Sequence, residues 1–467
     1  MTYTEFVCKP AGVDANASNL NGGSGGTPIT LTGCQLSNPT TLLSAIGLAS
    51  DPFGALVVGD WFTWDTAGAK NRGKVTSTSS WNGGTGQSTI SVAQTDGGST
   101  WVGVNRTCIF RGAWADPSMV ASLTTLSVDA AGDPPRLNVL AFDGGGNQIT
   151  YPAAVAVVNA CTASIPITVE GYRTAYGDLR GTMSCALVQL NSGIPNSGIF
   201  QINSGYVNVR NVSVATTQAG KHGFYINNVA NVHLINCVSS APAIAFYFYG
   251  GSGYLVDTCL ITVGGNSIFP ALFVTHSNGA AIVNVRVAGL NASALGAIEI
   301  SYAQGTLISG CVFYNFTGDC IVIQSGNVGL SLIDNTANTV SGNFVNAGSQ
   351  TDLSSLAITG SIFAGLTGKV VYSAAGSNVN LARFAHNMVY NCSWPYFSAN
   401  VVSAVEDVNT TDNPFTTGET LSAAAKSHAI LLADGITQTY PDYGAVQSQA
   451  DAAGGLLVQG PMTGGMT

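Results

Sequence analysis

The sequence predicts an all-β fold in which most of the chain forms a right-handed parallel β-helix. Short apolar triplets recur every 22–26 residues, a second short apolar strand follows each triplet, and no 3.6-residue helical period accompanies them. A period of this length with two or three short strands is typical of a β-solenoid. The six clearest triplets occupy residues 200–202, 224–226, 246–248, 272–274, 298–300 and 321–323.

The first part of the chain, residues 1–115, is predicted to be a small β domain that serves as an attachment region. Short alternating strands between residues 56 and 114 are separated by turn clusters at 82–84 and 96–98, each with two Gly residues. This pattern predicts a compact antiparallel β domain or barrel. Residues 16–32 are rich in Gly, Ser and Asn, and we expect them to form a loop or a pairing arm.

The β-helix is expected to span residues 116–415 and to begin with a capping helix. Asp116 can cap that helix, Pro117 suits its first turn, and apolar residues follow on one face. Such a helix would cover the core and the strand edges that an open solenoid end exposes. The apolar residues are Met119, Val120, Leu123 and Leu126.

Residues 416–467 are expected to form a C-terminal cap and tail. Ser422 can cap a helix that runs through Ala433, and Gly435 is a stop signal just beyond it. The tail over residues 452–467 has no core of its own. It is either a frayed end or a segment that docks onto a neighbouring subunit or particle.

The composition argues against several classes of protein and partner. Only 8% of the residues are charged and 46% are hydrophobic, which excludes global disorder. No apolar stretch approaches the roughly 18–20 residues that span a bilayer, so a membrane partner is not expected. A net charge of −9 without a basic cluster argues against nucleic acid. Residues 1–9 lack the pattern of a secretory signal, so export would need another route, such as release inside a phage particle.

The ten cysteines show neither CxxC pairs nor Cys/His metal spacing, so the sequence predicts no metal and no cofactor. A chain of this length does not need disulfide staples, and we expect buried free thiols that pack as small hydrophobes. Cys237, Cys259 and Cys311 recur in one register of the repeat. They predict an internal ladder.

Catalytic candidates are scarce, because few carboxylates lie within the repeats. A glycosidase needs two carboxyl groups about 5–9.5 Å apart. Glu299, at the outward middle position of its triplet, and Asp319, in the turn before the next triplet, are the best pair that the sequence offers. Two solvated surface carboxylates are the simpler interpretation of these residues.

The outward middle positions of three successive triplets carry aromatic residues. Tyr225, Tyr247 and Phe273 should therefore stack into a stripe on the outside of the β-helix. A contiguous apolar stripe of three large rings is seldom left facing water. A helix or loop of the same chain, a neighbouring subunit in a parallel homotrimer, or the rings of a sugar could cover it, and the sequence leaves these three covers open.

Residues 165–172, followed by 200–202 and 206–211, resemble the first coils of the pectate-lyase-like right-handed β-helix superfamily. The N-terminal layout and the segments 412–415 and 442–447 resemble β-helix fibre and spike proteins of tailed phages and prophages. These resemblances imply a β-helix fold and a place in a virion. The superfamily's catalytic motifs, an Asp-rich calcium site with a neighbouring Arg or an Asp-Asp pair, do not occur here, which counts against catalysis of the family type.

The sequence thus favours a non-enzymatic structural or adhesive component of a phage-like virion, such as a fibre, spike or head-attached protein. We expect a homotrimer that contacts other virion proteins, with a host surface glycan as its candidate ligand, and a location in the virion or otherwise outside the cell. The alternative is a polysaccharide depolymerase, a glycoside hydrolase or lyase acting on bacterial surface glycan, with Glu299 and Asp319 as the residues to test.

Overall fold

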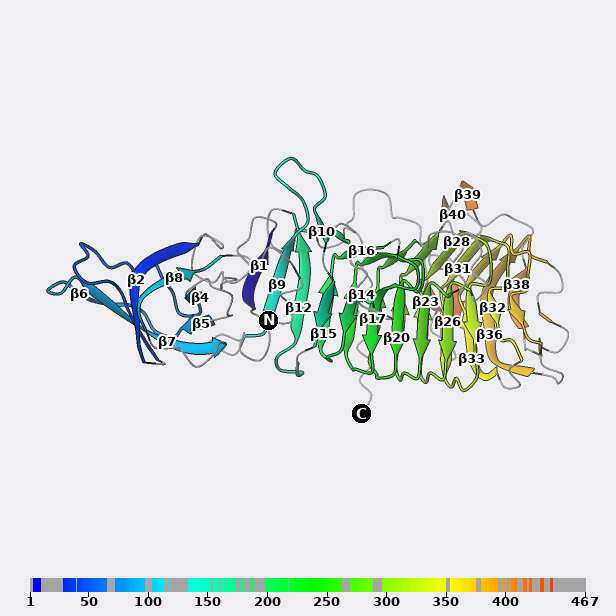
Figure 1. Ribbon diagram of the computed structural model, residues 1–467. Helices are drawn as coiled ribbons and strands as arrows, with labels where there is room; N and C mark the ends of the chain where they lie inside the picture. Colours follow the sequence, from blue (N-terminus) through cyan, green and yellow to red (C-terminus); the bar gives the residue numbers. More distant parts are fainter. Residues whose placement is uncertain are drawn as a thin grey trace.

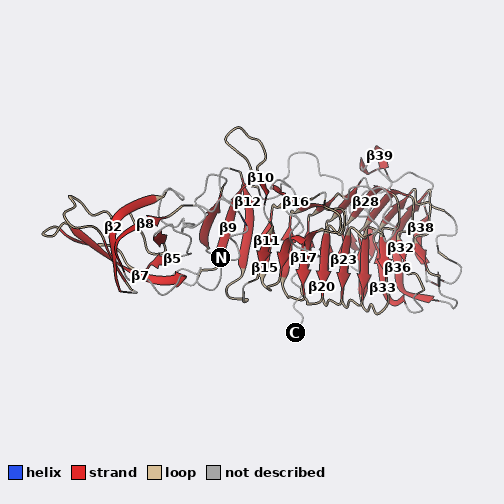
Figure 2. Cartoon of the chain, viewed as in Figure 1, coloured by secondary structure: helices blue, strands red, loops and turns tan. Residues whose placement is uncertain are grey.

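The computed structural model describes residues 3–9, 28–112, 117, 133–262, 269–288, 296–398 and short strands between 401 and 439, with internal gaps at 39, 65–71, 97–102, 153, 159–160, 174–177, 180–185, 189–197, 217, 350–352, 375–378 and 394–396. These residues form an elongated molecule with a small barrel at one end and a long solenoid beside it (Figure 1). The regular structure of the described residues is strand throughout, with no α-helix among them (Figure 2). The predicted all-β fold, a parallel β-helix behind a small β domain, is confirmed.

The N-terminal domain is an antiparallel sheet whose order, β3-β2-β8-β4-β5-β7-β6, is closed by a further pairing of β3 with β7. Its apolar side chains form a core of their own, in which the rings of Phe62 and Phe110 stack with centroids 5.0 Å apart. This is the antiparallel barrel that the turn clusters predicted. Its strands are β2 (Ile29–Asn38), β3 (Thr41–Leu43), β4 (Trp61–Trp64), β5 (Arg72–Val75), β6 (Ser80–Asn82), β7 (Gln87–Asp96) and β8 (Gly103–Phe110).

The repeated triplets form one parallel sheet of nine strands, which we call the front sheet because it faces the viewer in Figure 1. Phe224 pairs with Phe246, and Leu272 pairs with Ile298, so the triplets lie directly one above another as the repeat predicts. The strands in order are β11 (Val155–Val157), β14 (Gly198–Ile202), β17 (His222–Asn227), β20 (Phe246–Tyr249), β23 (Leu272–Thr275), β26 (Ile298–Ser301), β29 (Ile321–Ile323), β32 (Val345–Asn346) and β35 (Val371–Tyr372).

Two further ladders of parallel strands complete each coil. The first follows the front-sheet strand and contains β9 (Pro135–Leu140), β12 (Ile167–Tyr172), β15 (Val207–Arg210), β18 (Val232–Ile235), β21 (Leu255–Asp257), β24 (Ala281–Val283), β27 (Leu307–Ser309), β30 (Leu330–Ile333), β33 (Leu353–Thr359) and β36 (Val379–Tyr390). The second contains β10 (Thr150–Pro152), β13 (Ala186–Val188), β16 (Ser213–Ala215), β19 (Val238–Ser240), β22 (Leu260–Ile261), β25 (Arg286–Ala288), β28 (Val312–Phe316), β31 (Thr336–Val340) and β34 (Ile362–Ala364).

The interior is built from side chains that recur in register. The rings of Phe200, Phe224 and Phe246 stack along the axis with centroid distances of 5.5 and 5.1 Å, and all three are fully buried. Burying a large ring of this kind stabilises a fold by roughly 1.5–3 kcal/mol relative to leaving it exposed. Because the columns run from coil to coil, each coil completes the core of its neighbours, as in other repeat proteins.

In seven successive coils the turn between the second and third strands has a left-handed residue, at Asn211, Asn236, Thr258, Asn284, Gly310, Asp334 and Gly360. Asn and Gly tolerate this conformation, which explains their recurrence in the sequence. The Asn236 side-chain amide also donates to Asn211 Oδ1 at 2.6 Å, so the turns are bonded to one another along the axis.

The residue after each of these turns points inward. Cys237, Cys259 and Cys311 occupy this column and are fully buried free thiols, as predicted. Further along, the column becomes polar, and Asn335 and Asn387 use their side chains to bond buried backbone groups of adjacent coils. Buried polar groups satisfied in this way cost little stability. None of the nine cysteines in the described part of the chain forms a disulfide.

The first coil is completed by β1 (Thr4–Cys8), which pairs in parallel with β9 although the barrel separates the two strands in the sequence. The helix predicted from Asp116 lies outside the described residues except for Pro117. At the other end, the helix predicted from Ser422 through Ala433 is wrong over residues 429–431, because β41 (Ala429–Leu431) pairs antiparallel with β42 (Thr437–Thr439). β-sheet pairing overrides a weak helical pattern there. The tail beyond residue 439 lies outside the described residues.

Further short strands follow: β37 (Val401–Val402), β38 (Val405–Asn409), β39 (Phe415–Thr417) and β40 (Thr420–Leu421). Of these, β37 and β38 both pair in parallel with β36 and so extend the β-helix, whereas β39 and β40 form a two-stranded antiparallel sheet. A search of the described residues finds no helix with the length and hydropathy needed to cross a membrane.

Candidate functional site

The outward side of the front sheet carries an in-register row of side chains. Strand alternation points the middle residue of each triplet away from the core. Tyr225 pairs with Tyr247, and Tyr247 pairs with Phe273, so the predicted stacking of these three residues is confirmed. We call them the first aromatic row. The row continues with Gln201 at one end and with Glu299 and Val322 at the other.

The first aromatic row is closely stacked. The centroids of Tyr225 and Tyr247 are 5.3 Å apart at an interplanar angle of 48°, and those of Tyr247 and Phe273 are 5.3 Å apart at 11°. All three side chains are half-buried. Burial raises the pKa of the Tyr225 and Tyr247 phenols, so both hydroxyl groups keep their protons and can donate hydrogen bonds. The row offers a half-buried apolar surface of stacked rings together with two phenol hydroxyl groups.

A histidine extends the first aromatic row at the start of β17. The His222 ring stacks on Tyr225 with centroids 5.8 Å apart and meets Tyr247 edge-on at 5.1 Å. Its Nδ1 accepts a hydrogen bond from the backbone N–H of Ile244 at 3.3 Å. Burial, assisted by the positive charge of Lys221, lowers the pKa of His222 to about 4. The ring is therefore neutral near pH 7 and adds no positive charge to the surface.

A second aromatic row, which sequence reasoning missed, runs beside the first at the C-terminal ends of the front-sheet strands. The centroids of Tyr249 and His276 are 5.8 Å apart, and those of His276 and Tyr302 are 4.9 Å apart. Tyr249 also lies 6.4 Å from Tyr247, which joins the two rows. Tyr249 is 42% exposed and Tyr302 is 51% exposed. The 26-residue spacing of His276 and Tyr302 equals one coil and was the available signal.

His276 and Tyr302 adopt a left-handed backbone conformation, with φ of 54° and 51°. The backbone hydrogen bonds between coils place Asn228 and Gly250 at the same position of the turn in the preceding coils. Asn and Gly adopt this conformation readily, whereas a bulky residue there costs on the order of 1–3 kcal/mol. Two successive coils thus carry a bulky ring where a small residue would be less strained.

Glu299 is the outward residue that follows Phe273 along the row, and it is only 7% exposed. Burial raises the pKa of its carboxyl group, while a hydrogen bond with Gln324 acts in the opposite direction. The raised pKa increases the fraction of Glu299 that is protonated and able to donate a proton.

Asp319 is held by the next coil rather than directed at Glu299. Its Oδ1 accepts hydrogen bonds from the backbone N–H and side-chain amide of Asn343, at 2.7 and 2.8 Å. Its Oδ2 accepts from the Asn346 side-chain amide at 2.6 Å. Among the described residues, no hydrogen bond or ion pair joins Asp319 to Glu299. The two predicted catalytic candidates are therefore near neighbours in the repeat without forming a joined pair.

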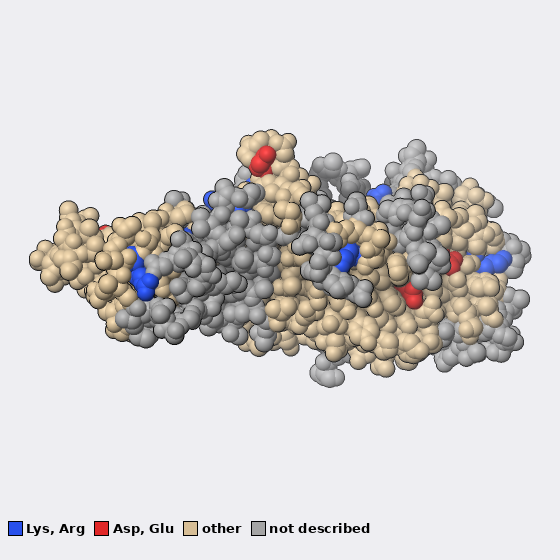
Figure 3. Space-filling model, in the orientation of Figure 1, with Lys and Arg blue, Asp and Glu red and all other residues tan. Residues whose placement is uncertain are grey.

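The front sheet carries very little charge. Glu299 is the one charged residue within its described strands, and Lys221, Asp319 and Lys369 lie just before three of them. Figure 3, in the orientation of Figure 1, shows few charged side chains over this sheet outside the grey parts. The described residues contain no group of three His, Cys, Asp or Glu that could hold a metal ion.

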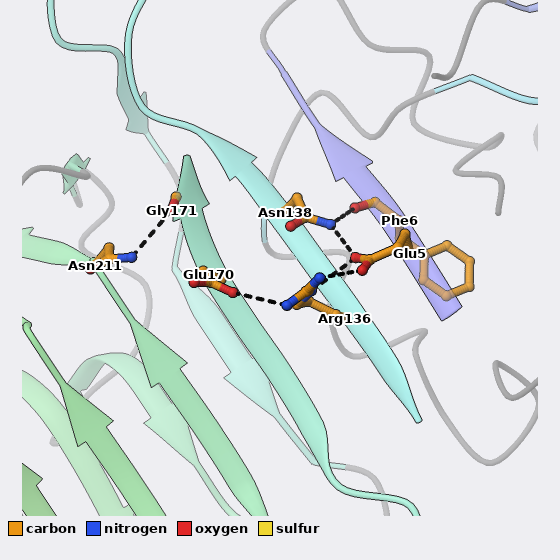
Figure 4. Close-up of polar contacts among 7 residues, drawn as sticks. All are labelled: Glu5, Phe6, Arg136, Asn138, Glu170, Gly171 and Asn211. Carbon is orange, nitrogen blue, oxygen red and sulfur yellow. Dashed lines mark hydrogen bonds and ion pairs between the residues drawn. The ribbon is translucent and has the colours of Figure 1, made fainter. Parts of the chain in front are cut away.

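A separate polar cluster lies at the first coil, away from the aromatic rows (Figure 4). Arg136 on β9 forms ion pairs with Glu5 on β1 and with Glu170 on β12, and the distance to Glu170 Oε2 is 3.3 Å. The Asn138 side chain donates to Glu5 Oε2 at 2.7 Å and to the backbone oxygen of Phe6 at 3.1 Å. The cluster joins three strands at the end of the solenoid through the two ion pairs of Arg136 and the hydrogen bonds of Asn138. We assign it to the fold.

Comparisons with known proteins find similarity among solved structures only. No family model matches the sequence, and no curated protein matches it. Among solved structures, it is similar to an alginate lyase from Paenibacillus sp. str. FPU-7, with 15% identity, a TM-score of 0.42, and coverage of 58% of this chain and 93% of the other.

Two further structures are similar over more of the chain but with lower scores. They are the Agl-KA catalytic domain, with 10% identity, a TM-score of 0.30 and coverage of 83% and 88%, and a thermostable GH87 α-1,3-glucanase from Streptomyces thermodiastaticus strain HF3-3, with 10% identity, a TM-score of 0.26 and coverage of 86% and 90%. At these identities and scores, no property of the three proteins is carried over to this chain.

Proposed function

We propose that the protein binds an extended polysaccharide along the outward side of the front sheet. The observation that carries this proposal is the in-register row of Tyr225, Tyr247 and Phe273, with its rings about one strand spacing apart. Sugar rings present apolar C–H faces that pack on aromatic rings, and their hydroxyl groups pair with polar groups at the edge. The phenols of Tyr225 and Tyr247 supply such groups.

A polysaccharide suits this surface better than a dry protein interface does. Apolar surface of this extent seldom faces water without a function. The tyrosines of the first aromatic row carry hydroxyl groups, and the partly exposed Tyr249 and Tyr302 beside the row carry two more. A partner that covers this surface must therefore form hydrogen bonds with several polar atoms. A chain of hydroxyl-rich rings meets that demand along its whole length.

The biological setting that we propose is a fibre, spike or head-attached protein of a phage-like virion that recognises host surface glycan. The sequence layout supports this setting, and the elongated column of coils suits a projecting structural part (Figure 1). We propose a parallel homotrimer that contacts other virion proteins. A trimer leaves the aromatic rows available only if a different face of the column forms the contact.

A second candidate function, polysaccharide cleavage, is favoured by one observation. Glu299 directly follows Phe273 in the row, is almost fully buried, and has a raised pKa because of that burial. A protonated carboxyl beside a bound sugar could act as the general acid of a glycoside hydrolase or lyase. Asp319 is the candidate for the second group that this chemistry requires, and its carboxylate oxygens accept hydrogen bonds from Asn343 and Asn346.

Binding is tested by affinity electrophoresis and calorimetry with a panel of soluble bacterial and plant polysaccharides. We expect Tyr247→Ala to weaken binding by about tenfold or more, because a stacked ring contributes on the order of 1–2 kcal/mol. Tyr314→Ala is the matched control, since Tyr314 is a half-buried residue of β28 on a different sheet. Equal losses in both variants, or no retention of the wild-type protein by any glycan, would contradict the proposal.

The same panel of polysaccharides also distinguishes glycan binding from a subunit interface and from polysaccharide cleavage. If Tyr247→Ala converts a trimer into a monomer in sedimentation analysis and leaves glycan binding unchanged, the row is a subunit interface. If the wild-type protein releases reducing ends or unsaturated products and Glu299→Gln abolishes this release while binding persists, the protein is a depolymerase. Absence of any cleavage across the panel removes the enzymatic candidate.

A further inference from the structure

The second aromatic row has features that the packing of the β-helix does not require. His276 and Tyr302 lie in turns just beyond the ends of β23 and β26, whereas Tyr249 is the last residue of β20. Tyr302 has half of its surface exposed. Truncating such a residue removes little buried area. A structural role would therefore give these rings only a small contribution to stability.

Part of this row has a left-handed backbone conformation that Asn or Gly would adopt with less strain than a bulky residue. His276 and Tyr302 have φ values near +50°, and Gly326 follows them at the equivalent turn position in the next coil. Strain of this kind persists where the side chain is needed, and it clusters at binding sites. Neighbouring coils of the same chain have Asn or Gly at this turn position.

The rings of this row are also held in place by hydrogen bonds. Thr275 Oγ1 and His276 Nδ1 are 2.8 Å apart, and the Ser325 hydroxyl donates to the Tyr302 hydroxyl at 3.2 Å. A ring whose orientation is set before the ligand arrives loses less conformational entropy on binding. Together with Tyr249, these contacts make a preformed edge beside Tyr247.

The charge of the surrounding surface limits the class of ligand. A polyuronate or sulfated glycan carries negative charge on many of its sugars and requires matching Lys or Arg side chains. In the described part of the site, Lys221 is the one cation beside the first row, and Glu299 lies at the opposite end. His222 is neutral near pH 7 because its pKa is lowered to about 4.

We propose that the row formed by Tyr249, His276 and Tyr302 is a second line of sugar-binding positions, and that the two rows together select a neutral glycan. This inference rests on the proposed function and deepens it. The first row stacks on one sugar chain, and the second row contacts a side branch or the lateral face of the same chain. A polyanionic glycan is disfavoured by the lack of cations and by Glu299.

The test uses variants that relieve backbone strain while removing a ring. Tyr302→Asn places a residue that favours positive φ at this turn, so thermal stability should stay equal or rise. Binding of a neutral, branched glucan, measured by calorimetry on the full chain, should weaken by about threefold to tenfold. The wild-type protein should bind this glucan at least tenfold more tightly than alginate or polygalacturonate at moderate salt.

Tyr206→Asn is the matched control. Tyr206 also has a positive φ, of 57°, and it lies in a turn several coils away from Tyr302. This variant should relieve similar strain without changing glucan binding. A loss of stability in Tyr302→Asn without loss of binding would overturn the inference, as would tighter binding of the polyuronates by the wild-type protein.

Comparing the Tyr247→Ala and Tyr302→Asn variants shows whether a failure concerns the second aromatic row alone or glycan binding as a whole. If Tyr247→Ala loses glucan binding and Tyr302→Asn does not, the first row binds glycan and the second row does not. If the wild-type protein retains neither neutral nor acidic glycans, both the proposed function and this inference are wrong.

Discussion

Asp334 shows how the repeat constrains a single residue. It has a φ of 54° in the turn register that contains Asn284 and Gly310 in the preceding coils. The side chain lies against the following coil, where a Cβ at Gly360 would be 2.1 Å from Asp334 Oδ1. A side chain at position 360 would force the Asp334 carboxyl group to move, and the φ of 67° at this position also favours glycine. Burial raises the pKa of Asp334 to about 6, because the charged carboxylate loses hydration there.

Asp334→Asn should stabilise the protein at neutral pH. The unfolded chain releases the Asp334 proton near its ordinary pKa of 3.8 and the folded chain releases it near pH 6, so stability falls as pH rises through this window and stays lower above it. The asparagine variant has no carboxyl group at this position, so its stability does not fall in this way as the pH rises. We expect a gain of up to about 3 kcal/mol at pH 7.5 and little difference at pH 3.5, measured by urea unfolding. A gain that did not depend on pH would contradict this explanation.

At the scale of elements, β1 covers the end of the solenoid. Its pairing with β9 is reinforced by Arg136, which lies between Glu5 and Glu170, and Glu170 is fully buried. Acidic neighbours raise the pKa of Arg136 against the opposing effect of burial. Two carboxylates that face one cation attract it strongly, and without it they repel each other.

Arg136→Gln should therefore loosen β1. Removing one partner of a buried ion pair costs about 3–5 kcal/mol, and most of this cost should appear locally as faster amide hydrogen exchange in Thr4–Cys8. The control is Arg383→Gln, because Arg383 is exposed on a late coil. Unchanged exchange in β1, or an equal increase in the control, would show that the ion pairs do not hold the strand.

At the scale of the whole molecule, the barrel and the β-helix have largely separate cores. The barrel core contains Phe62 and Phe110, whereas the β-helix core runs from Phe6 to the last coils. The two meet where Trp61 of β4 packs against Phe6 of β1, with ring centroids 6.1 Å apart. This contact couples the unfolding of the barrel and the β-helix only weakly, compared with the packing inside either core.

Calorimetry should consequently resolve two unfolding transitions. Phe62→Ala should lower the midpoint of one transition and Phe246→Ala that of the other, each by an amount that corresponds to roughly 3–5 kcal/mol. The two phenylalanines are both fully buried, so each serves as the control for the other. A single transition that both variants shift equally would show that the barrel and the solenoid unfold as one unit.

The periodicity of the sequence was sufficient to predict the solenoid, the stacking of Phe224 on Phe246, and the outward row of Tyr225, Tyr247 and Phe273. The physical reason is that a parallel coil repeats its register, so residues one period apart must lie one above another. Local alternation then decides which of them face outward.

Only the tertiary structure decided contacts that do not follow the period. The start of the chain supplies β1 to the first coil because its strand pairs with β9 across the barrel, and no local pattern encodes such a pairing. Asp319 accepts side-chain hydrogen bonds from Asn343 and Asn346, which its sequence distance from Glu299 did not indicate. In the second aromatic row, His276 and Tyr302 are turn residues whose side-chain directions depend on left-handed backbone angles, so their spacing of one coil did not by itself place them beside Tyr249.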